Sequence, residues 1–531
     1  MEAASFIFSL NYLELEKQEK KIKDMKVGIV FLLFAAVCES YRILCIFPHQ
    51  MKSHFDVFEP LLKELSARGH DLTVISHFPQ KRKISRYTDI SLKGSADILV
   101  EAVSLNQINP SRIDKYLTSR FITRFANIVC QKGLSLPAVR NLHQDGCKFD
   151  LVIAEFFSSN CFLSLLNQCR VPLIATSSCE LLPWINDFFA NPDNPSYIPI
   201  VFMDYYKMGF IERLENAFLY MANKVLYEYF SVWDANSAAK ANFNVQNVER
   251  FAFNASLMLV NSYFALNRAR PFVPSIIEVG GIHLQEPKQL PLNIEKWINE
   301  SKDGVIYFSM GSMIKGHTFP EHKKQAFLRA FGRLKQRVLW KWENDTMPGK
   351  PDNVMIQKWM PQFDILCHPN VKGFVSHGGL LGTTEAVHCG VPVVVMPQFG
   401  DQHTNARALE AGGGGIVLDF HNIEEDTVYR ALKTILDPEF NKKAKQLSER
   451  FRDRPMPPLE TAIYWIEYVA RHKGADHMRT AAVNMPFYQY LLLDVIAFLI
   501  LALAFTIFIV YHTIRITCGM CCKKTQKVKK S

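Results

Sequence analysis

Short apolar runs alternate with amphipathic stretches along most of the chain. The runs have the length of strands, and the stretches, such as residues 58–68 before Gly69, have the periodicity of helices. Apolar strands that alternate with helices are typical of parallel sheets covered on both faces. We expect buried strands at residues 43–47, 72–75, 150–154, 172–175, 305–309, 338–341, 354–357, 373–376 and 392–396. The pattern predicts an α/β fold of two Rossmann-like domains that face each other across a cleft, because ligands bind outside the carboxyl ends of such strands.

Two longer apolar segments lie near the ends of the chain. Lys26, the apolar run 27–37 and the small residues up to Ser40 have the arrangement of a signal peptide. A polar stretch precedes them, so the true start stays open between Met1 and Met25. Near the other end, residues 490–511 form an apolar run of ~20 residues, which is enough to cross the ~30 Å hydrocarbon core of a membrane.

These segments and the proline-containing stretches divide the chain into seven expected parts. The parts are an N-terminal extension with a signal peptide (1–40), a first Rossmann-like domain (41–283), a linker (284–300), a second Rossmann-like domain (301–452), returning helices with the membrane approach (453–489), a transmembrane helix (490–511) and a basic tail (512–531).

The distribution of charge indicates how the chain is oriented in a membrane. The 531 residues carry a net charge of +10, and the last twenty contain six basic residues and no acidic ones. The rest therefore carries only +4, too little and too dispersed to suggest nucleic-acid binding. A basic flank predicts a cytosolic C-terminus and a single-pass type I topology with the body in the lumen.

Several short motifs agree with a lumenal body. Asn254, Asn299 and Asn344 each begin an N-glycosylation sequon. The lysines of the last five residues, 527–531, resemble a retrieval signal for the endoplasmic reticulum, although a plain basic flank would look the same. The expected location is therefore the endoplasmic reticulum membrane.

The twelve cysteines show no spacing of metal ligands. We expect ordinary buried thiols and allow for one disulfide. The chain also has no Asp-x-Asp motif, so the sequence calls for no metal and no redox cofactor.

The densest group of chemically useful residues lies at 359–402. His377, Gly378 and Gly379 follow a predicted strand and lead into a helix. Glycines let a ligand approach the backbone, and a helix N-terminus offers free N–H groups and a partial positive charge to phosphate. This loop therefore predicts a phosphate site.

Further side chains in the same stretch suit the rest of a nucleotide. Glu385 lies in the helix after the glycines, where its carboxylate could hold a ribose diol. Trp359 offers a flat face to a base, and such stacking contributes ~1–3 kcal/mol per base. Asp401 and Gln402 follow the next strand, which ends at the same edge of the sheet.

These motifs resemble those of the UDP-glycosyltransferase family, most closely its insect membrane-bound members. The family signature is matched by Trp359-Met-Pro-Gln362, His377-Gly-Gly379, Glu385-Ala386, Gly390-Val-Pro392, Pro397 and Asp401-Gln402. Further landmarks are Arg68-Gly-His70, Val279-Gly-Gly-Ile-His283, Phe308-Ser-Met-Gly-Ser312, Arg452-Asp-Arg-Pro455 and Leu493-Asp-Val495, so the resemblance covers nearly the whole chain.

The resemblance implies a fold of the GT-B type in which the second half binds a UDP-sugar. Trp359 would stack on uracil with Gln362 beside it, and Glu385 would bind the ribose. The residues expected at the diphosphate are His377, Gly379, Gly382, Thr383 and Ser312, and those expected at the sugar hydroxyls are Asp401 and Gln402. Many relatives carry Asn two places after the second glycine, where this chain has Leu381, so Leu381 is left out of the site.

An inverting transfer needs a base that takes the proton of the acceptor hydroxyl, and histidine suits this role because an unperturbed imidazole has a pKa of about 6.5. His54 is the candidate, since it lies in the loop after the strand 43–47, where relatives carry a Ser-His base; His49 is the local alternative. Relatives orient this base with an Asp after a strand that begins Phe-Asp. Here Glu155 stands at that position, and a carboxylate of either length can hold an imidazole.

The sequence therefore predicts an inverting UDP-glycosyltransferase that conjugates a small lipophilic acceptor, as in detoxification. UDP-glucose is the expected donor, with UDP-glucuronate as the alternative. The apolar region 121–230, with Trp184, Phe188 and Phe189, is the expected source of the acceptor pocket. A homo-oligomer stays open. A lumenal binding protein without transfer activity is the second hypothesis, and a glycosidase, which would need two flanking carboxylates, is the third.

Overall fold

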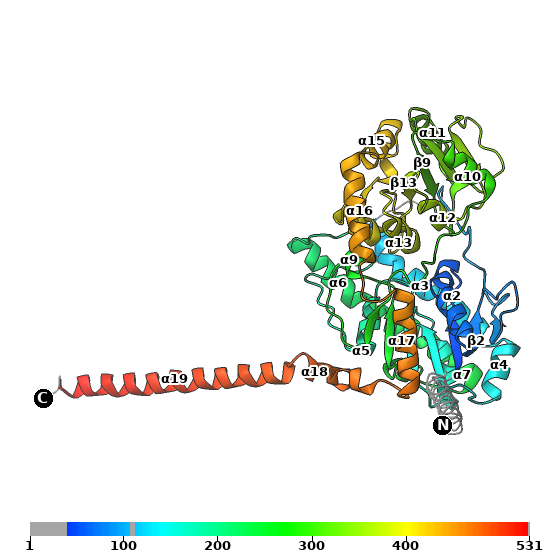
Figure 1. Ribbon diagram of the computed structural model, residues 1–531. Helices are drawn as coiled ribbons and strands as arrows, with labels where there is room; N and C mark the ends of the chain where they lie inside the picture. The colour runs from blue at the N-terminus through cyan, green and yellow to red at the C-terminus, as the bar shows by residue number, and fades with distance from the viewer. Residues whose placement is uncertain (1–39, 107–111, 529–531) are drawn as a thin grey trace, which may run out of the picture.

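The structure, a computed structural model, describes residues 40–106 and 112–528. Two α/β domains stack on each other, and one long helix leaves the lower domain (Figure 1). The predicted N-terminal extension and signal peptide lie outside the described residues, apart from Ser40. The last three residues, with two of the lysines of the predicted retrieval signal, lie outside them as well.

The first domain is built on a parallel sheet of seven strands in the order β3-β2-β1-β5-β6-β7-β8. Its central strands are buried on both faces, as their unbroken apolar sequences predict. The strand order reverses between β1 and β5, which pair directly. The strands are β1 (Arg42–Phe47), β2 (Asp71–Ser76), β3 (Tyr87–Ser91), β5 (Leu151–Glu155), β6 (Leu173–Ser177), β7 (Leu257–Val260) and β8 (Ile276–Glu278).

The second domain repeats the architecture with a parallel sheet of six strands in the order β12-β11-β9-β13-β14-β15. Here the order reverses between β9 and β13, which also pair. The strands are β9 (Val305–Ser309), β11 (Arg337–Lys341), β12 (Val354–Gln357), β13 (Val371–Ser376), β14 (Val393–Val395) and β15 (Gly415–Val417). The prediction of two doubly wound domains is confirmed.

Helices cover both sheets. Those of the first domain are α2 (Lys52–Ala67), α3 (Arg112–Gly133), α4 (Pro137–Gln144), α5 (Pro183–Phe189), α6 (Phe210–Leu226), α7 (Trp233–Phe243), α8 (Glu249–Phe253) and α9 (Phe264–Asn267), with the 3-10 helix η1 (Asn160–Gln168) and the π-helical turn η2 (Tyr227–Val232). Those of the second are α10 (Leu292–Asn299), α11 (Glu321–Gly332), α12 (Gln362–Leu366), α13 (Leu380–Cys389), α14 (Gln402–Ala411), α15 (Glu425–Ile435) and α16 (Pro438–Arg452), with the 3-10 helices η3 (Gly316–Thr318) and η4 (Phe420–Asn422).

All nine predicted strands are present, and four further strands of the two large sheets were missed from sequence. β3 is an edge strand with polar, partly exposed residues, and β8 is an edge strand of only three residues, so neither has the long apolar run of a central strand. β7 and β15 are only four and three residues long, and runs this short cannot be told from a piece of helix.

The predicted helix at 58–68 begins earlier, at Lys52, and continues through Pro60. The placement of His54 in a loop was therefore wrong, because His54 lies in the first turn of α2.

Several contacts join the two domains. The chain returns to the first domain through α17 (Pro458–Arg471), whose Ile463 and Ile466 share a buried cluster with Phe58 of α2. A short parallel pairing joins β4 (Val103–Ser104) of the first domain to β10 (Ile314–Lys315) of the second. At a third point, the hydroxyl of Thr404 donates to the carbonyl oxygens of Val201 (2.7 Å) and Met203 (2.9 Å).

The cysteines depart from the expectation of buried thiols with at most one disulfide. Three disulfides link Cys130 to Cys161, Cys147 to Cys169 and Cys367 to Cys389. Each joins elements that are adjacent only in the folded chain, so no local spacing could have revealed the pairing. Cys45 and Cys179 are buried thiols, as expected.

After α17 the chain leaves the body through η5 (Asp476–Met478), η6 (Ala481–Asn484) and α18 (Phe487–Tyr490), and continues as α19 (Leu493–Val528). The apolar part of α19, Leu493–Met520, is long and apolar enough to cross a membrane, and none of it is buried. The predicted transmembrane segment ends at residue 511. The helix continues past this residue, because no residue there interrupts the helix. The bounds proposed for the seven parts of the chain otherwise remain predictions.

Two tryptophans of the second domain provide a matched test of packing. Trp340 is fully buried and stacks on Phe308, with ring centroids 4.4 Å apart, whereas Trp359 is 69% exposed. Trp340→Ala is expected to destabilise the protein by about 3–5 kcal/mol, because it leaves a cavity. Trp359→Ala should change stability by less than about 0.5 kcal/mol. Thermal unfolding of the detergent-solubilised chain measures both, and equal shifts in melting temperature would contradict this account of the core.

Candidate functional site

The residues singled out from the sequence gather at the points where strand order reverses in the two sheets. His54 follows β1, Glu155 ends β5, and Ser178 follows β6 in the first domain. Ser312 follows β9 and His377 follows β13 in the second. Parallel strands bring these ends to one edge of each sheet, and such reversal points are the usual ligand sites of open α/β sheets.

His54 is held by a buried carboxylate and a hydroxyl. Its Nδ1 lies 2.6 Å from Oε1 of Glu155 and 2.7 Å from Oγ of Ser178. The Glu155 side chain is fully buried, and its Oε2 has no hydrogen-bond partner among the described residues. A carboxylate only accepts hydrogen bonds, so the Nδ1 atom that faces it carries a proton. Ser178 was missed from sequence, because a serine after a strand carries no signal of its own.

Two rings fix the plane of the His54 imidazole. His49 stacks on it with ring centroids 4.2 Å apart, and Phe157 meets it edge to face at 4.4 Å. Burial lowers the pKa of His49 well below the usual range, and the nearby His54 lowers it further. Nδ1 of His49 accepts the backbone N–H of Met51 at 3.1 Å. The pair therefore consists of a neutral His49 and a His54 that is held by a carboxylate.

His377 fits between two glycines of the second domain. A Cβ at Gly311 would lie 2.5 Å from the imidazole, and a Cβ at Gly379 would lie 2.6 Å from it, so only glycine leaves room for the ring. Burial and the nearby Lys341 lower the pKa of His377 to about 4. The ring is neutral, so it can donate a hydrogen bond to phosphate but brings no positive charge to neutralise it. Its Nδ1 is enclosed without a hydrogen-bond partner among the described residues.

Glu385 lies on α13, in contact with two other elements. Gln362, the first residue of α12, donates from Nε2 to its Oε2 at 2.6 Å. Nε2 of His283 lies 4.0 Å from its Oε1. Burial raises the pKa of Glu385 to about 7, against the effect of the Gln362 hydrogen bond. His283 was noted from sequence only as a family landmark, and its place beside Glu385 emerges from the fold.

Asp401 and Gln402 lie at the start of α14 with different surroundings. Oδ2 of Asp401 accepts from Nδ2 of Asn405 at 2.9 Å, and Asn405 also donates to the carbonyl of Gly378 at 3.0 Å. Burial raises the pKa of Asp401. Gln402 is buried, and its Oε1 accepts the backbone N–H of Gln398 at 2.9 Å. The oxygen of Gln402 thus orders the loop before α14, and only its amide nitrogen is left for a ligand.

The remaining predicted residues of this half lie around the same edge. Trp359 lies between β12 and α12 with its ring exposed. Thr383 is buried in the first turn of α13, and a Cβ at Gly382 would lie 3.0 Å from Nε2 of Gln362. The carbonyl of Ser312 accepts the backbone N–H of Glu101 from the first domain at 2.8 Å.

The two halves of the site face each other. Burial raises the pKa of Asp401, and a protonated His54 in the first domain would act in the opposite direction, so the two side chains are close enough to interact. Leu380, the first residue of α13, is buried within the hydrophobic core of the first domain. Its neighbour Leu381 packs against a second cluster of that domain. The residue that departs from the family pattern is therefore an apolar contact between the domains.

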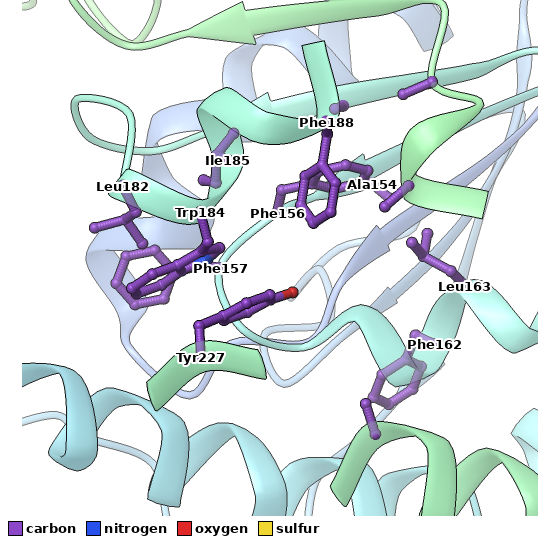
Figure 2. Close-up of a cluster of buried hydrophobic side chains, with 14 of the residues drawn as sticks. Ala154, Phe156, Phe157, Phe162, Leu163, Leu182, Trp184, Ile185, Phe188 and Tyr227 are labelled. Atoms are coloured by element: carbon purple, nitrogen blue, oxygen red, sulfur yellow. The ribbon is translucent and has the colours of Figure 1, made fainter. Parts of the chain in front are cut away.

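The aromatic residues expected to line an acceptor pocket lie in the core. Trp184 stacks on Tyr227 with centroids 4.7 Å apart, and Phe188 packs edge to face on Phe156 (Figure 2). Trp184, Phe188 and Phe189 are almost completely buried. They belong to the packed core of the first domain rather than to an open lining. In residues 40–106 and 112–528 no three His, Cys, Asp or Glu side chains cluster to hold a metal ion, and the absence of a metal requirement stays a prediction.

Comparisons with known proteins agree with this geometry. Residues 43–528 match the family model described as "UDP-glucoronosyl and UDP-glucosyl transferase". The chain is 44% identical to "UDP-glycosyltransferase UGT5" of Dactylopius coccus, with 93% of this chain and 98% of that protein aligned. It is 38% identical to "UDP-glucosyltransferase 2" of the same insect, over 91% and 94% of the two chains. It is 30% identical to "UDP-glucuronosyltransferase 1A8" of Rattus norvegicus, over 90% and 92%.

Solved structures share the fold at low sequence identity. The glycosyltransferase of kitacinnamycin aligns over 81% of this chain and 99% of its own, with a TM-score of 0.54 and 16% identity. The calicheamicin glycosyltransferase CalG4 aligns over 82% and 99%, with a TM-score of 0.52 and 17% identity. These are glycosyltransferases of the GT-B fold. With the family model matched over most of the chain, this protein belongs to the UDP-glucosyl and UDP-glucuronosyl transferase family and is a glycosyltransferase.

Proposed function

We propose that this glycosyltransferase transfers glucose from UDP-glucose to a hydroxyl of a small lipophilic acceptor, with inversion at the anomeric carbon. The observation that carries the proposal is the contact between His54 and Glu155 at the edge of the sheet that faces the donor domain. A lumenal binding protein would not need a buried carboxylate fixed on an imidazole, because that arrangement costs desolvation and gives no binding surface.

The first domain supplies the base in this proposal. Glu155 keeps the proton of the His54 ring on Nδ1, so Nε2 can take the proton of the acceptor hydroxyl as its oxygen attacks the anomeric carbon. The imidazolium that forms is stabilised by the Glu155 carboxylate 2.6 Å away. Ser178 restricts rotation of the ring, and the neutral His49 stacked on it adds no opposing charge.

The second domain binds the donor in this proposal. The exposed Trp359 ring stacks on uracil, and Glu385 with Gln362 receives the ribose. The diphosphate lies at the N-terminus of α13, near Gly379, Gly382, Thr383 and the loop at Ser312, with His377 as a neutral donor. Asp401 accepts from the sugar hydroxyls, and the amide of Gln402 donates to them.

The choice of glucose rests on the relatives, and the cellular role rests on the apolar surroundings of the base. An insect relative that is 38% identical carries the name glucosyltransferase, and the mammalian relatives named glucuronosyltransferases are 30–34% identical. The base lies beside Phe157, which belongs to the cluster of buried hydrophobic side chains in Figure 2, and these apolar surroundings favour lipophilic acceptors and a role in conjugation or detoxification. Competition between radiolabelled UDP-glucose and UDP-glucuronate for transfer to a panel of phenols tests the donor.

We also propose that α19 anchors the protein in the endoplasmic reticulum membrane with the body in the lumen. Disulfides form and persist in oxidising compartments, and three are present. The sequon residues Asn254, Asn299 and Asn344 are all exposed, as glycosylation requires. Leu493–Met520 of α19 is long and apolar enough to cross a membrane, and the described residues do not bury it.

His54→Ala is expected to lower kcat by about 10²–10⁴-fold, because the acceptor proton then has no base. The Kd for UDP should not change, since His54 belongs to the acceptor side. His49→Ala is the matched control and should lose less activity, because its ring touches no carboxylate among the described residues. Turnover at the wild-type rate in His54→Ala would remove His54 from its role.

His377→Ala is expected to weaken UDP binding by about tenfold, the effect of losing one hydrogen bond of about 1.4 kcal/mol. Uridine lacks the diphosphate, so its affinity should fall much less. Calorimetric titration of the full chain in detergent with each ligand measures both constants. A matching loss for uridine would mean that the substitution disturbs the fold of the site rather than a phosphate contact.

Binding of uridine should tighten as pH rises through about 7. Burial raises the pKa of Glu385 to about 7 in the free protein, and ribose hydroxyls favour the ionised carboxylate, so binding releases a proton. If binding lowers this pKa by one unit, the Kd falls about tenfold from acid to alkaline pH. Glu385→Gln should bind uridine with no such dependence, and a flat profile in the wild type would contradict this place for the ribose.

A further inference from the structure

The helix α6 is buried on one side and carries exposed apolar side chains on the other. Its inner side, with the buried residues Asn216, Leu219, Tyr220 and Asn223, packs against the first domain. On the opposite side, six large apolar side chains leave 59–69% of their surface exposed: Phe210, Ile211, Leu214, Phe218, Met221 and Val225.

This exposed side continues past the end of α6. Tyr229 in η2 and Trp233 at the start of α7 are each 74% exposed, and steps of three or four residues connect them to the apolar side of the helix. We call these eight side chains, from Phe210 to Trp233, the outer stripe. A continuous row of this kind differs from the single exposed hydrophobic residues found on any surface, and it marks a contact with a partner or a membrane.

The position of the outer stripe selects the membrane. α6 projects from the body on the side from which α19 runs, at the left in Figure 1. The apolar part of α19, Leu493–Met520, defines the direction in which the chain would cross a bilayer. A bilayer crossed by α19 would therefore lie next to α6.

The chemistry of the outer stripe also suits a lipid surface. Interfacial helices place Phe, Leu and Trp in the boundary between headgroups and acyl chains, with basic residues beside them. Lys207 and Arg213 flank the stripe and are exposed, where they can reach lipid phosphates. Tyr229 and Trp233 at its end are the aromatic types found at membrane interfaces.

We propose that the outer stripe inserts into the leaflet of the membrane that α19 crosses, on the side of the catalytic body. The inference rests on the proposed anchoring by α19. The body is then attached at two places, the anchor and α6, so it cannot rotate freely on the chain between α17 and α19. Its first domain, which carries His54, is held against the lipid surface.

Photo-crosslinking of the full chain in phosphatidylcholine vesicles tests the inference. A benzophenone amino acid replaces Phe218 of the outer stripe, Phe505 in α19 as the positive control, or Lys335, an exposed residue after α11, as the matched negative control. After irradiation, mass spectrometry identifies what each probe has captured. Adducts with phospholipid are expected at 218 and 505 but not at 335.

Each other outcome has a definite meaning. Lipid at 505 without lipid at 218 overturns the docking of α6 and leaves the anchor intact. Capture of a second copy of the chain at 218 overturns it in favour of a dimer. No lipid at 505 overturns the anchor and the inference together.

A charge variant separates insertion from chance proximity. Replacing both Leu214 and Met221 by Glu should lower the lipid adduct at 218 by about tenfold, since buried charge opposes insertion. Both residues are exposed, so the melting temperature in detergent should stay the same. An unchanged yield of the adduct in this variant contradicts insertion.

Discussion

Every strand of the two large sheets runs parallel to its neighbours, and the site follows from this constraint. Parallel strands must send all their strand-to-helix connections out at one edge. In each sheet the order reverses at a central pair, β1 with β5 and β9 with β13, so a gap opens between helices at that edge. The proposed base and its carboxylate lie at the first reversal point, and the proposed phosphate loop lies at the second.

The proposed transfer also requires that the carboxyl edge of the first sheet faces that of the second. The β4–β10 pairing ties the loop at Ser312 to the first domain, and Thr404 ties α14 to the loop at Val201 and Met203. Leu381 adds an apolar contact at the start of α13, the helix of the proposed phosphate site. The elements proposed to bind the donor are thus attached directly to the domain that holds the proposed base, and a shift between the domains would move one relative to the other.

Burial shifts four ionisable side chains around the candidate site toward their neutral forms. Burial keeps His49 and His377 neutral, with lowered pKa values, and raises the pKa of Glu385 and Asp401. In such surroundings, each charge brought by a ligand is felt strongly, because little water screens it. The longer Glu155 is accommodated without loss of contact, since its Oε1 reaches His54 at 2.6 Å.

The sequence by itself determined the class of fold, the central strands, the residues grouped around His377 and the resemblance to the family. These could be found because apolar periodicity and motif spacing are local properties of the chain. It did not determine the edge strands, which lack a long apolar run. It also did not determine where α2 begins, and the observed start at Lys52 places His54 inside that helix. Only the tertiary structure decided the partners of the site residues: Ser178 at His54, His283 at Glu385, Leu381 between the domains and the three disulfides. These contacts join residues far apart in the chain, and their distances are set by the packing of whole elements, which no short stretch of sequence encodes.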